Sequence, residues 1–233
     1  MVNYLELPIG DRSPEVFRAV IEIPKDNTNK FEYDKELHVF KLDRNLHSPV
    51  HYPGDYGFIP STLSDDGDPL DVLVLVPSPS FPGCVQEVRP VGLMEMLDQG
   101  VLDEKVLAVG KNNPRYTNVW NYTDIYPHML KEITHFFSIY KDLEGKRVEI
   151  KGWHDAAYAR DRVILAAKQF VENKEKKSQA KPLDSKVKVA ARINLVPQRR
   201  ADDPTTRKPG RRRHKRSTDV DIVQDFVCLQ SPK

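Results

Sequence analysis

Hydrophobic and polar residues alternate over residues 17–23, and the pattern ends at Pro24. A period of two predicts a β-strand with one buried face. Further hydrophobic runs predict strands over residues 31–33, 39–42, 72–76, 88–96 and 105–109. Proline and glycine residues after the 72–76 run, and a Gln99-Gly100 pair, indicate turns between them. Short strands at this spacing favour a barrel-like sheet.

Residues 47–63 follow neither a strand nor a helix period. They are rich in proline, glycine and aromatic residues, which predicts a loop held by packing. Hydrophobic residues then recur at helical spacing over residues 129–140. We expect Asp124 to cap this helix and the helix to end near Gly145.

A final strand is predicted over residues 147–153, and Asp155 is placed to cap a second helix. The buried stripe of that helix is predicted to include Val163, Ala166, Ala167, Phe170 and Val171. Beyond residue 177 the periodicity is lost, and clusters of Lys and Arg alternate with prolines. We therefore expect a folded domain over residues 1–177 and a disordered tail over residues 178–233.

The formal net charge of +2 conceals two oppositely charged parts. Residues 1–177 hold 22 Lys and Arg against 28 Asp and Glu, a net charge of −6, whereas residues 178–233 hold 14 against 6, a net charge of +8. An acidic body is a poor surface for nucleic acid. Any binding to nucleic acid is therefore assigned to the basic tail alone.

The sequence predicts a cytoplasmic protein with no membrane partner. No apolar run is long enough to span a bilayer, and the first six residues lack the features of a signal peptide. The two cysteines, Cys84 and Cys228, lie far apart and form no disulfide or metal-binding pattern. Free thiols are typical of a reducing compartment.

Candidate chemistry is concentrated in residues 66–71, which read Asp-Gly-Asp-Pro-Leu-Asp and lead directly into the apolar strand at 72–76. Carboxylates crowded in this way raise one another's pKa, so such a cluster at the start of a buried strand usually holds hard cations. Ligands that are all oxygen point to Mg²⁺ or Mn²⁺.

Other interpretations of the acidic run explain less. Three aspartates in an isolated turn often form only a solvated loop. An EF-hand needs Gly and Glu at the sixth and twelfth positions of its loop, where this chain has Asp71 and Pro77. An aspartyl-phosphate phosphatase places its motif after a buried strand, but residues 61–65 are too polar to form one.

Cationic and phenolic side chains are interleaved with further acids on both sides of the run. These residues are Glu22, Lys30, Glu32, Arg44, Tyr52, Tyr56, Asp98, Asp103, Lys105, Tyr140 and Lys141. Carboxylates alone would only bind metal, whereas added Lys, Arg and Tyr donors suit an anionic phosphate ester or anhydride. Two metal ions in such a site can activate a water for in-line displacement at phosphorus.

In these residues the chain resembles the family I soluble inorganic pyrophosphatases. The signature of that family, Asp-x-Asp-Pro-(apolar)-Asp, is matched by residues 66–71. The flanking motifs match in order: Val20-Ile21-Glu22-Ile23-Pro24, Lys30-Phe31-Glu32, Asp43-Arg44, Tyr52-Pro53, Asp55-Tyr56-Gly57, Arg89-Pro90-Val91-Gly92, Asp98, Asp103-Glu104-Lys105, His135-Phe136-Phe137 and Tyr140-Lys141. The resemblance extends to about residue 177, and the tail has no counterpart in it.

The resemblance implies an α+β, mainly β fold, with a small twisted five-stranded OB-like barrel and two flanking helices before the basic tail. It implies Mg²⁺-dependent hydrolysis of pyrophosphate to two orthophosphates, with several Mg²⁺ ions in each site. It also implies a homo-oligomer, either a hexamer or a dimer. Hexameric bacterial members often carry two histidines one turn apart on the first helix. This chain has the first, His135, but Ile139 at the position of the second.

The resemblance also implies a role for each matching side chain. Asp68 matches the general base, which takes a proton from the water that bridges the metal ions. The phosphate-binding positions are Lys30, Arg44, Tyr56, Lys105, Tyr140 and Lys141. The metal-binding positions are Asp66, Asp71 and Asp103 for the inner ions, Asp98 with Asp103 for a further ion, and Glu22 and Glu32 as outer acidic contacts.

A non-catalytic alternative remains open from the residues. Between Asp98 and Asp103 many relatives carry extra acids, but this chain has Gln99, Val101 and Leu102. The body would then be a phosphate-binding scaffold, and the basic tail would bind nucleic acid or an acidic partner.

Overall fold

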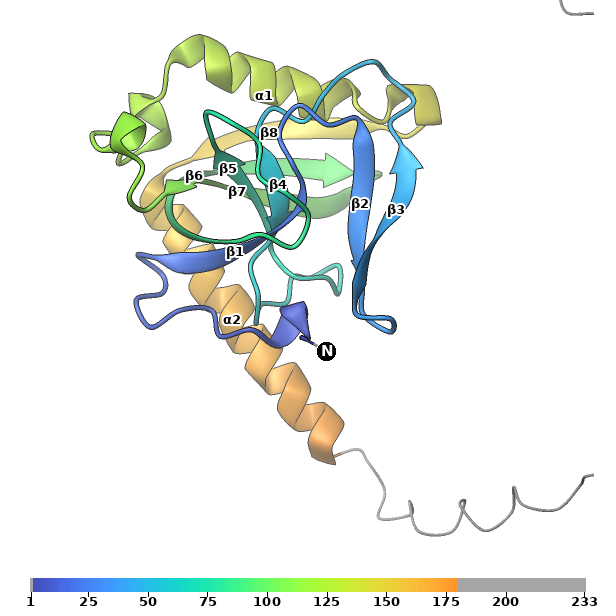
Figure 1. Ribbon diagram of the computed structural model, residues 1–233, viewed down its shortest axis with the longest axis vertical. Helices are drawn as coiled ribbons and strands as arrows, with labels where there is room; N and C mark the ends of the chain where they lie inside the picture. Colours follow the sequence, from blue (N-terminus) through green and yellow to red (C-terminus); the bar gives the residue numbers. More distant parts are fainter. Residues whose placement is uncertain (1, 180–233) are drawn as a thin grey trace, which may run out of the picture. The chain divides into compact units, whose positions relative to one another are not determined.

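The computed structural model describes residues 2–179, which form a mainly β structure with two α-helices (Figure 1). The strands are β1 (Phe17–Ile23), β2 (Asn29–Asp34), β3 (Val39–Asn45), β4 (Asp55–Phe58), β5 (Asp71–Leu75), β6 (Val85–Asp98), β7 (Val101–Gly110) and β8 (Val148–His154). The α-helices are α1 (Pro127–Ile139) and α2 (Ala156–Gln179). Short 3₁₀ turns cover Tyr4–Glu6, Pro114–Tyr116, Tyr122–Asp124 and Asp142–Glu144.

Five strands form a closed ring in the order β1-β4-β5-β7-β6, because the long strand β6 also pairs with β1. Strands β5 and β7 are parallel, and the other neighbours in the ring are antiparallel. Strand β8 pairs with the far half of β6, outside the ring. The predicted mainly β fold with two flanking helices is confirmed, and the five strands that were expected to form a barrel form this ring.

Both faces of the ring strands are buried, each against a different helix. Along β5, Leu73 and Leu75 pack in the cluster that includes the buried side of α1. Val72 and Val74 pack in a second cluster with Ala159 and other α2 residues. Burial on both faces explains why β5 is a continuous apolar run rather than an alternating one.

The prediction of a loop over residues 47–63 is wrong, because this segment contains the fully buried strand β4. The strand gives no alternating pattern because aromatic residues and Gly57 fill positions on both faces. A methyl group on Gly57 would lie 1.9 Å from the carbonyl oxygen of Val20 on β1. The ring closes tightly between β1 and β4 only because this position has no side chain.

Two details of the first helix also differ from prediction. Asp124 does not cap α1; its carboxylate accepts hydrogen bonds from the amides of Trp120 and Asn121, and α1 begins at Pro127. The α-helix ends at Ile139 and not near Gly145, which instead closes the following 3₁₀ turn. Proline fixes the start of α1 because it lacks the amide that an earlier turn would need.

The second helix is capped as predicted, since the Asp155 carboxylate accepts a hydrogen bond from the amide of Tyr158 at 2.8 Å. Val171, however, is 54% exposed rather than buried, because the second half of α2 extends beyond the ring (Figure 1). The helix continues to Gln179, so the predicted domain boundary after residue 177 falls within its last turn. The rest of the predicted disordered tail lies outside the described residues.

Strands β2 and β3 form a separate hairpin beside the ring (Figure 1). Tyr33 of this hairpin packs with Val20 and Phe58 of the ring, and Tyr4 and Phe40 cover the cluster. Antiparallel pairing places Lys30 opposite Arg44 on the two strands. The hairpin therefore brings two cations to the same edge of the ring.

Within residues 2–179, neither helix combines the length and the apolar composition that a membrane span requires.

We predict that Gly57→Ala lowers the free energy of unfolding by about 3 kcal/mol, because the added methyl group forces β1 and β4 apart. Urea denaturation of the purified protein measures this change. Gly110→Ala is the matched control, since its methyl group would meet the Cβ atom of Asn113 at an ordinary 3.5 Å. Equal stability of the two variants would contradict the tight β1–β4 closure.

Candidate active site

A cleft of about 390 Å³ opens between β1, the β2–β3 hairpin, β4 and the acidic loop that precedes β5. It is lined by Leu5, Glu22, Lys30, Glu32, Tyr33, Lys35, Tyr56, Phe58, Asp66, Asp68, Pro69, Asp71 and Asp103. Eight of these are among the site residues predicted from the sequence. They come from segments far apart in the chain, and the closed ring and the β2–β3 hairpin bring them together.

The acidic loop makes a tight turn at Gly67, whose φ of 91° lies in the left-handed region that favours glycine. The Asp66 carboxylate accepts a hydrogen bond from the amide of Asp68 at 3.0 Å. Burial raises the pKa of Asp66, although this hydrogen bond opposes the shift. The Asp68 side chain is 68% exposed at the rim, with an oxygen 3.4 Å from the Lys35 ammonium.

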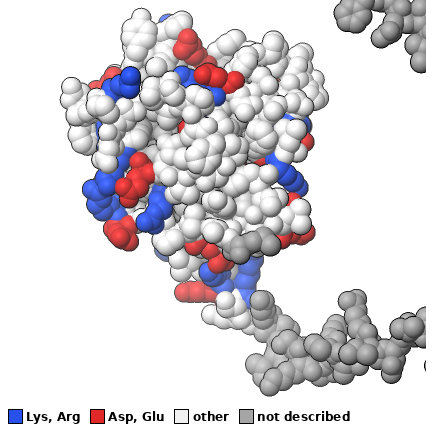
Figure 2. Space-filling view, viewed as in Figure 1, with Lys and Arg blue, Asp and Glu red and all other residues white. Residues whose placement is uncertain are grey.

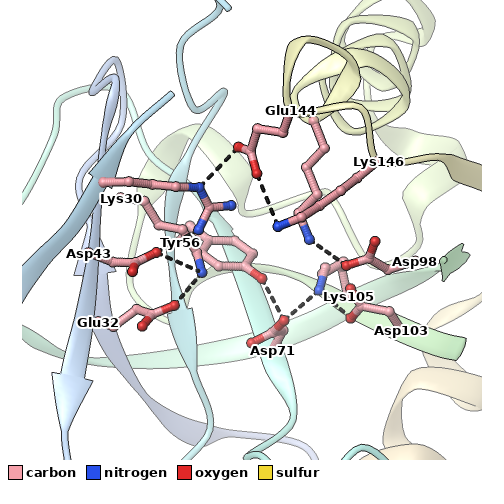
Figure 3. Close-up of polar contacts among 12 residues, drawn as sticks. Lys30, Glu32, Asp43, Tyr56, Asp71, Asp98, Asp103, Lys105, Glu144 and Lys146 are labelled. Carbon is pink, nitrogen blue, oxygen red and sulfur yellow. Dashed lines mark hydrogen bonds and ion pairs between the residues drawn. The ribbon is translucent and has the colours of Figure 1, made fainter. Parts of the chain in front are cut away.

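A buried ammonium group joins two carboxylates at the centre of the site (Figure 3). The parallel register of β5 and β7 pairs Asp71 with Lys105. Lys105 Nζ donates to Asp71 Oδ2 at 2.5 Å and also to Asp103. The Tyr56 hydroxyl donates to the same Asp71 oxygen at 2.5 Å. Three strands therefore converge on Asp71.

The charges in this centre determine one another's protonation. Burial alone lowers the pKa of Lys105, but the carboxylates of Asp71 and Asp103 raise it above its ordinary value. Burial raises the pKa of Asp103, and the Lys105 ammonium opposes that shift. Lys105 is only 3% exposed, so it stays a fixed positive charge in a place where an unpaired ion would be strongly destabilising.

Asp98 lies at the end of β6, beside Asp103 (Figure 3). Lys141, which follows α1, donates to Asp98 Oδ2. The other oxygen, Asp98 Oδ1, is buried and has no hydrogen-bond partner among the described residues. Tyr140 is buried, and burial raises the pKa of its hydroxyl, so it is available as a neutral donor.

The hairpin contributes an alternating set of cations and acids. Lys30 Nζ donates to Glu32 and lies 3.8 Å from an Asp43 oxygen. Arg44 Nη1 donates to the same Asp43 oxygen at 2.5 Å. These contacts hold both cations near the cleft without burying them completely.

Glu144 is a site residue that the sequence analysis missed. Its side chain is only 6% exposed, and it accepts a hydrogen bond from Arg44 Nε at 3.0 Å. Its other oxygen lies 3.2 Å from Lys146 Nζ (Figure 3). No local pattern in the sequence connects Glu144 to Arg44, because the two lie 100 positions apart.

Glu22 lies on β1 at the inner wall of the cleft. Burial raises its pKa from 4.5 to about 8, against a hydrogen bond from the amide of Tyr33 at 2.8 Å. The nearby Asp71 carboxylate adds to the increase. Glu22 therefore adds to the crowding of acids that the sequence predicted around this centre.

The donor set suits hard divalent cations. Asp66, Asp71 and Asp103 line one cleft, and each can offer only carboxylate oxygens to a cation. Asp98 adds a buried carboxylate oxygen that has no hydrogen-bond partner among the described residues. Among residues 2–179, no three acidic, imidazole or thiol side chains form a closed metal-binding group in this arrangement. The Lys105 ammonium lies between Asp71 and Asp103 and compensates their charge.

Comparisons with known proteins agree with this geometry. The family model described as "Pyrophosphatase: Inorganic pyrophosphatase" matches residues 19–171. An inorganic pyrophosphatase of Haloferax volcanii is 50% identical over 175 residues, which cover 74% of this chain and 99% of the relative. An inorganic pyrophosphatase of a Nostoc species is 49% identical over 157 residues, which cover 67% of this chain and 93% of the relative.

The crystal structure of the Thermus thermophilus inorganic pyrophosphatase has the same fold. It aligns with a TM-score of 0.71 and 45% identity, covering 73% of this chain and 99% of that one. The chain therefore belongs to the inorganic pyrophosphatase family, the family I soluble enzymes that its motifs resemble.

Proposed function

We propose that this protein hydrolyses inorganic pyrophosphate to two orthophosphates with Mg²⁺, and that Asp68 is the general base. The observation that carries the proposal is the single cleft in which Asp66, Asp71 and Asp103 meet the cationic and phenolic side chains. The relatives named above are inorganic pyrophosphatases at about half identity, which supports the same substrate here.

We assign the metal positions to the carboxylates of the cleft. Asp66, Asp71 and Asp103 would hold the inner Mg²⁺ ions, and Asp98 with Asp103 a further one. Bound Mg²⁺ lowers the pKa of a water molecule and neutralises charge on phosphate oxygens. We assign Glu22 and Glu32 as outer acidic contacts, since the Glu22 carboxylate already accepts a hydrogen bond from the amide of Tyr33 and Glu32 is paired with Lys30.

The cations and hydroxyls of the site bind and orient the substrate. The proposed phosphate ligands are Lys30, Arg44, Tyr56, Lys105, Tyr140 and Lys141. Each of the four cations has a carboxylate partner inside the site, so its position is defined before substrate arrives. A pre-positioned donor does not have to be reordered when charge develops on a phosphate oxygen.

Asp68 suits the role of proton acceptor because of its position. It lines the cleft beside Asp66 and Asp71 but forms no ion pair with Lys105. Its only ion-pair partner among the described residues is the exposed Lys35 at 3.4 Å. An exposed carboxylate at the rim can accept a proton from the attacking water and release it to solvent.

The non-catalytic alternative is less well supported. It requires a degenerate site, but every carboxylate and cation of the proposed set is present. On the face in Figure 2, basic and acidic side chains occur in mixed groups and form no broad basic surface. Nucleic-acid binding by the tail, a hexameric or dimeric assembly and a cytoplasmic location stay predictions.

We predict that Asp68→Asn lowers kcat for pyrophosphate about 100-fold or more, because the amide cannot accept the proton. A phosphate-release assay with saturating Mg²⁺ measures the rate, and circular dichroism verifies the fold. Asp11→Asn, which removes an equal charge outside the cleft, serves as the control. A wild-type rate in Asp68→Asn would remove this residue from the mechanism.

We predict that Glu22→Gln stabilises the metal-free protein increasingly as the pH rises from about 5 to 8. The folded-state pKa of Glu22 is raised to about 8, so its contribution to stability is complete below the unfolded-state value and is lost as the pH approaches 8. Gln stays neutral and avoids that loss. Urea denaturation in EDTA at several pH values measures the gap, and a gap that does not change with pH would contradict the burial of this carboxyl.

We propose that the folded domain is sufficient for hydrolysis, and predict that truncation after Gln179 leaves kcat and KM within twofold of the full chain. The cut keeps all of α2, whereas the boundary after residue 177 would remove the end of its last turn. Loss of activity in the shortened chain would show that residues 180–233 belong to the catalytic unit.

A further inference from the structure

Helix α2 touches both of the segments that carry the central carboxylates, and it does so from outside the cleft. Three contacts lie along one side of the helix, at Arg162, Ala166 and Gln169. Residues spaced by four and then three positions share a helix face. Figure 1 shows this helix crossing the ring as one continuous rod.

The first contact is with strand β7. Glu104 lies between Asp103 and Lys105 in the sequence, so the alternation of the strand directs its side chain to the opposite face. That side chain is 4% exposed, and Arg162 Nε donates to its Oε2 at 2.6 Å. Burial raises the pKa of Glu104, and Arg162 opposes the shift.

Among the described residues, Arg162 is the only ion-pair partner of Glu104. Glu104 Oε1 is buried and has no hydrogen-bond partner there. The cross-strand neighbour on β6 is Glu95, a like charge that is itself paired with His154 at 2.8 Å. Like charges directly opposite on neighbouring strands repel. Without Arg162, the buried Glu104 carboxyl would have no cationic partner on this part of β7.

The second and third contacts are with the acidic loop. The amide of Leu63 donates to the carbonyl oxygen of Ala166 at 2.9 Å. Gln169 Nε2 donates to Asp65 Oδ1 at 3.0 Å. Asp65 directly precedes Asp66, so these two contacts hold the start of the turn that directs Asp66 into the cleft.

We propose that Arg162 and Gln169 are positioning residues, through which α2 sets the separation between the acidic loop and the carboxylate of Asp103 on β7. The two segments face each other across a second, smaller cleft, whose lining includes Asp66, Asp103 and Arg162. A rigid helix attached to both segments fixes their spacing before any cation binds. This inference rests on the proposed function, because it assumes that these aspartates hold metal.

Groups that orient metal ligands without touching the metal typically change affinity 10- to 100-fold when they are removed. We therefore expect Arg162→Met to weaken Mg²⁺ binding about 10-fold. Gln169→Glu places a carboxylate against Asp65 and repels the loop, so we expect about threefold weaker binding. Arg162→Lys keeps the charge but not the planar Nε donor, so it should restore part of the affinity.

The test is calorimetric titration of each metal-free, full-length protein with Mg²⁺ in the absence of pyrophosphate, with kcat and KM as a second readout. Two variants of α2 serve as controls. Lys168→Met removes an equal charge from an exposed position, and Ala157→Gly lowers helix stability by about 1 kcal/mol at another. Both should bind Mg²⁺ within twofold of wild type, and kcat of Arg162→Met should recover as Mg²⁺ is raised.

The outcomes separate this inference from the proposed function. Wild-type Mg²⁺ affinity in Arg162→Met would overturn this inference and leave the proposed function standing. An equal loss of affinity in Ala157→Gly and Gln169→Glu would do the same, because it would mean that loss of helix stability in general explains the effect. If Arg162→Met does not fold, Arg162→Lys and Gln169→Glu decide by the same criterion. If the wild type itself binds no Mg²⁺, the proposed metal assignment fails and the inference fails with it.

Discussion

The structure of the site depends on the placement of one buried ammonium group between carboxylates that would otherwise repel one another. Lys105 satisfies Asp71 and Asp103 at the same time, while Tyr56 donates to Asp71 from the neighbouring strand. An unpaired charge at this depth would be strongly destabilising, so the ring must hold all three strands in register. The fold therefore maintains a crowd of acids that the isolated segments could not tolerate.

The closed ring gives this centre its precision. The parallel β5–β7 pair sets Asp71 against Lys105, and the antiparallel β6–β7 pair places Asp103 opposite Met96 in the packed interior. Because β1 also pairs with β6, each of these five strands has a hydrogen-bonded neighbour on both sides for at least part of its length. Side chains on strands buried on both faces have little freedom to move, which suits the proposed role of presenting several oxygens to small cations.

Many residues of the candidate site were predictable because their carboxylates, cations and hydroxyls lie in local sequence motifs. The acidic run at residues 66–71 carries its turn, its carboxylates and the start of a strand within a few residues. The strand β4 was missed because burial on both faces removes the alternating pattern, and Gly57 gives no periodic signal. The contact of Glu144 with Arg44 was missed because it joins positions 100 residues apart.

The residues alone indicate the class of chemistry, since oxygen ligands and cations in this order along the chain predict a metal-assisted phosphate site. Which of these groups meet depends on the tertiary fold, in which α2 contacts both carboxylate-bearing segments through Arg162 and Gln169. Composition and spacing record what each residue can do. Ring closure and helix docking bring distant residues together, and a one-dimensional pattern contains no measure of that distance.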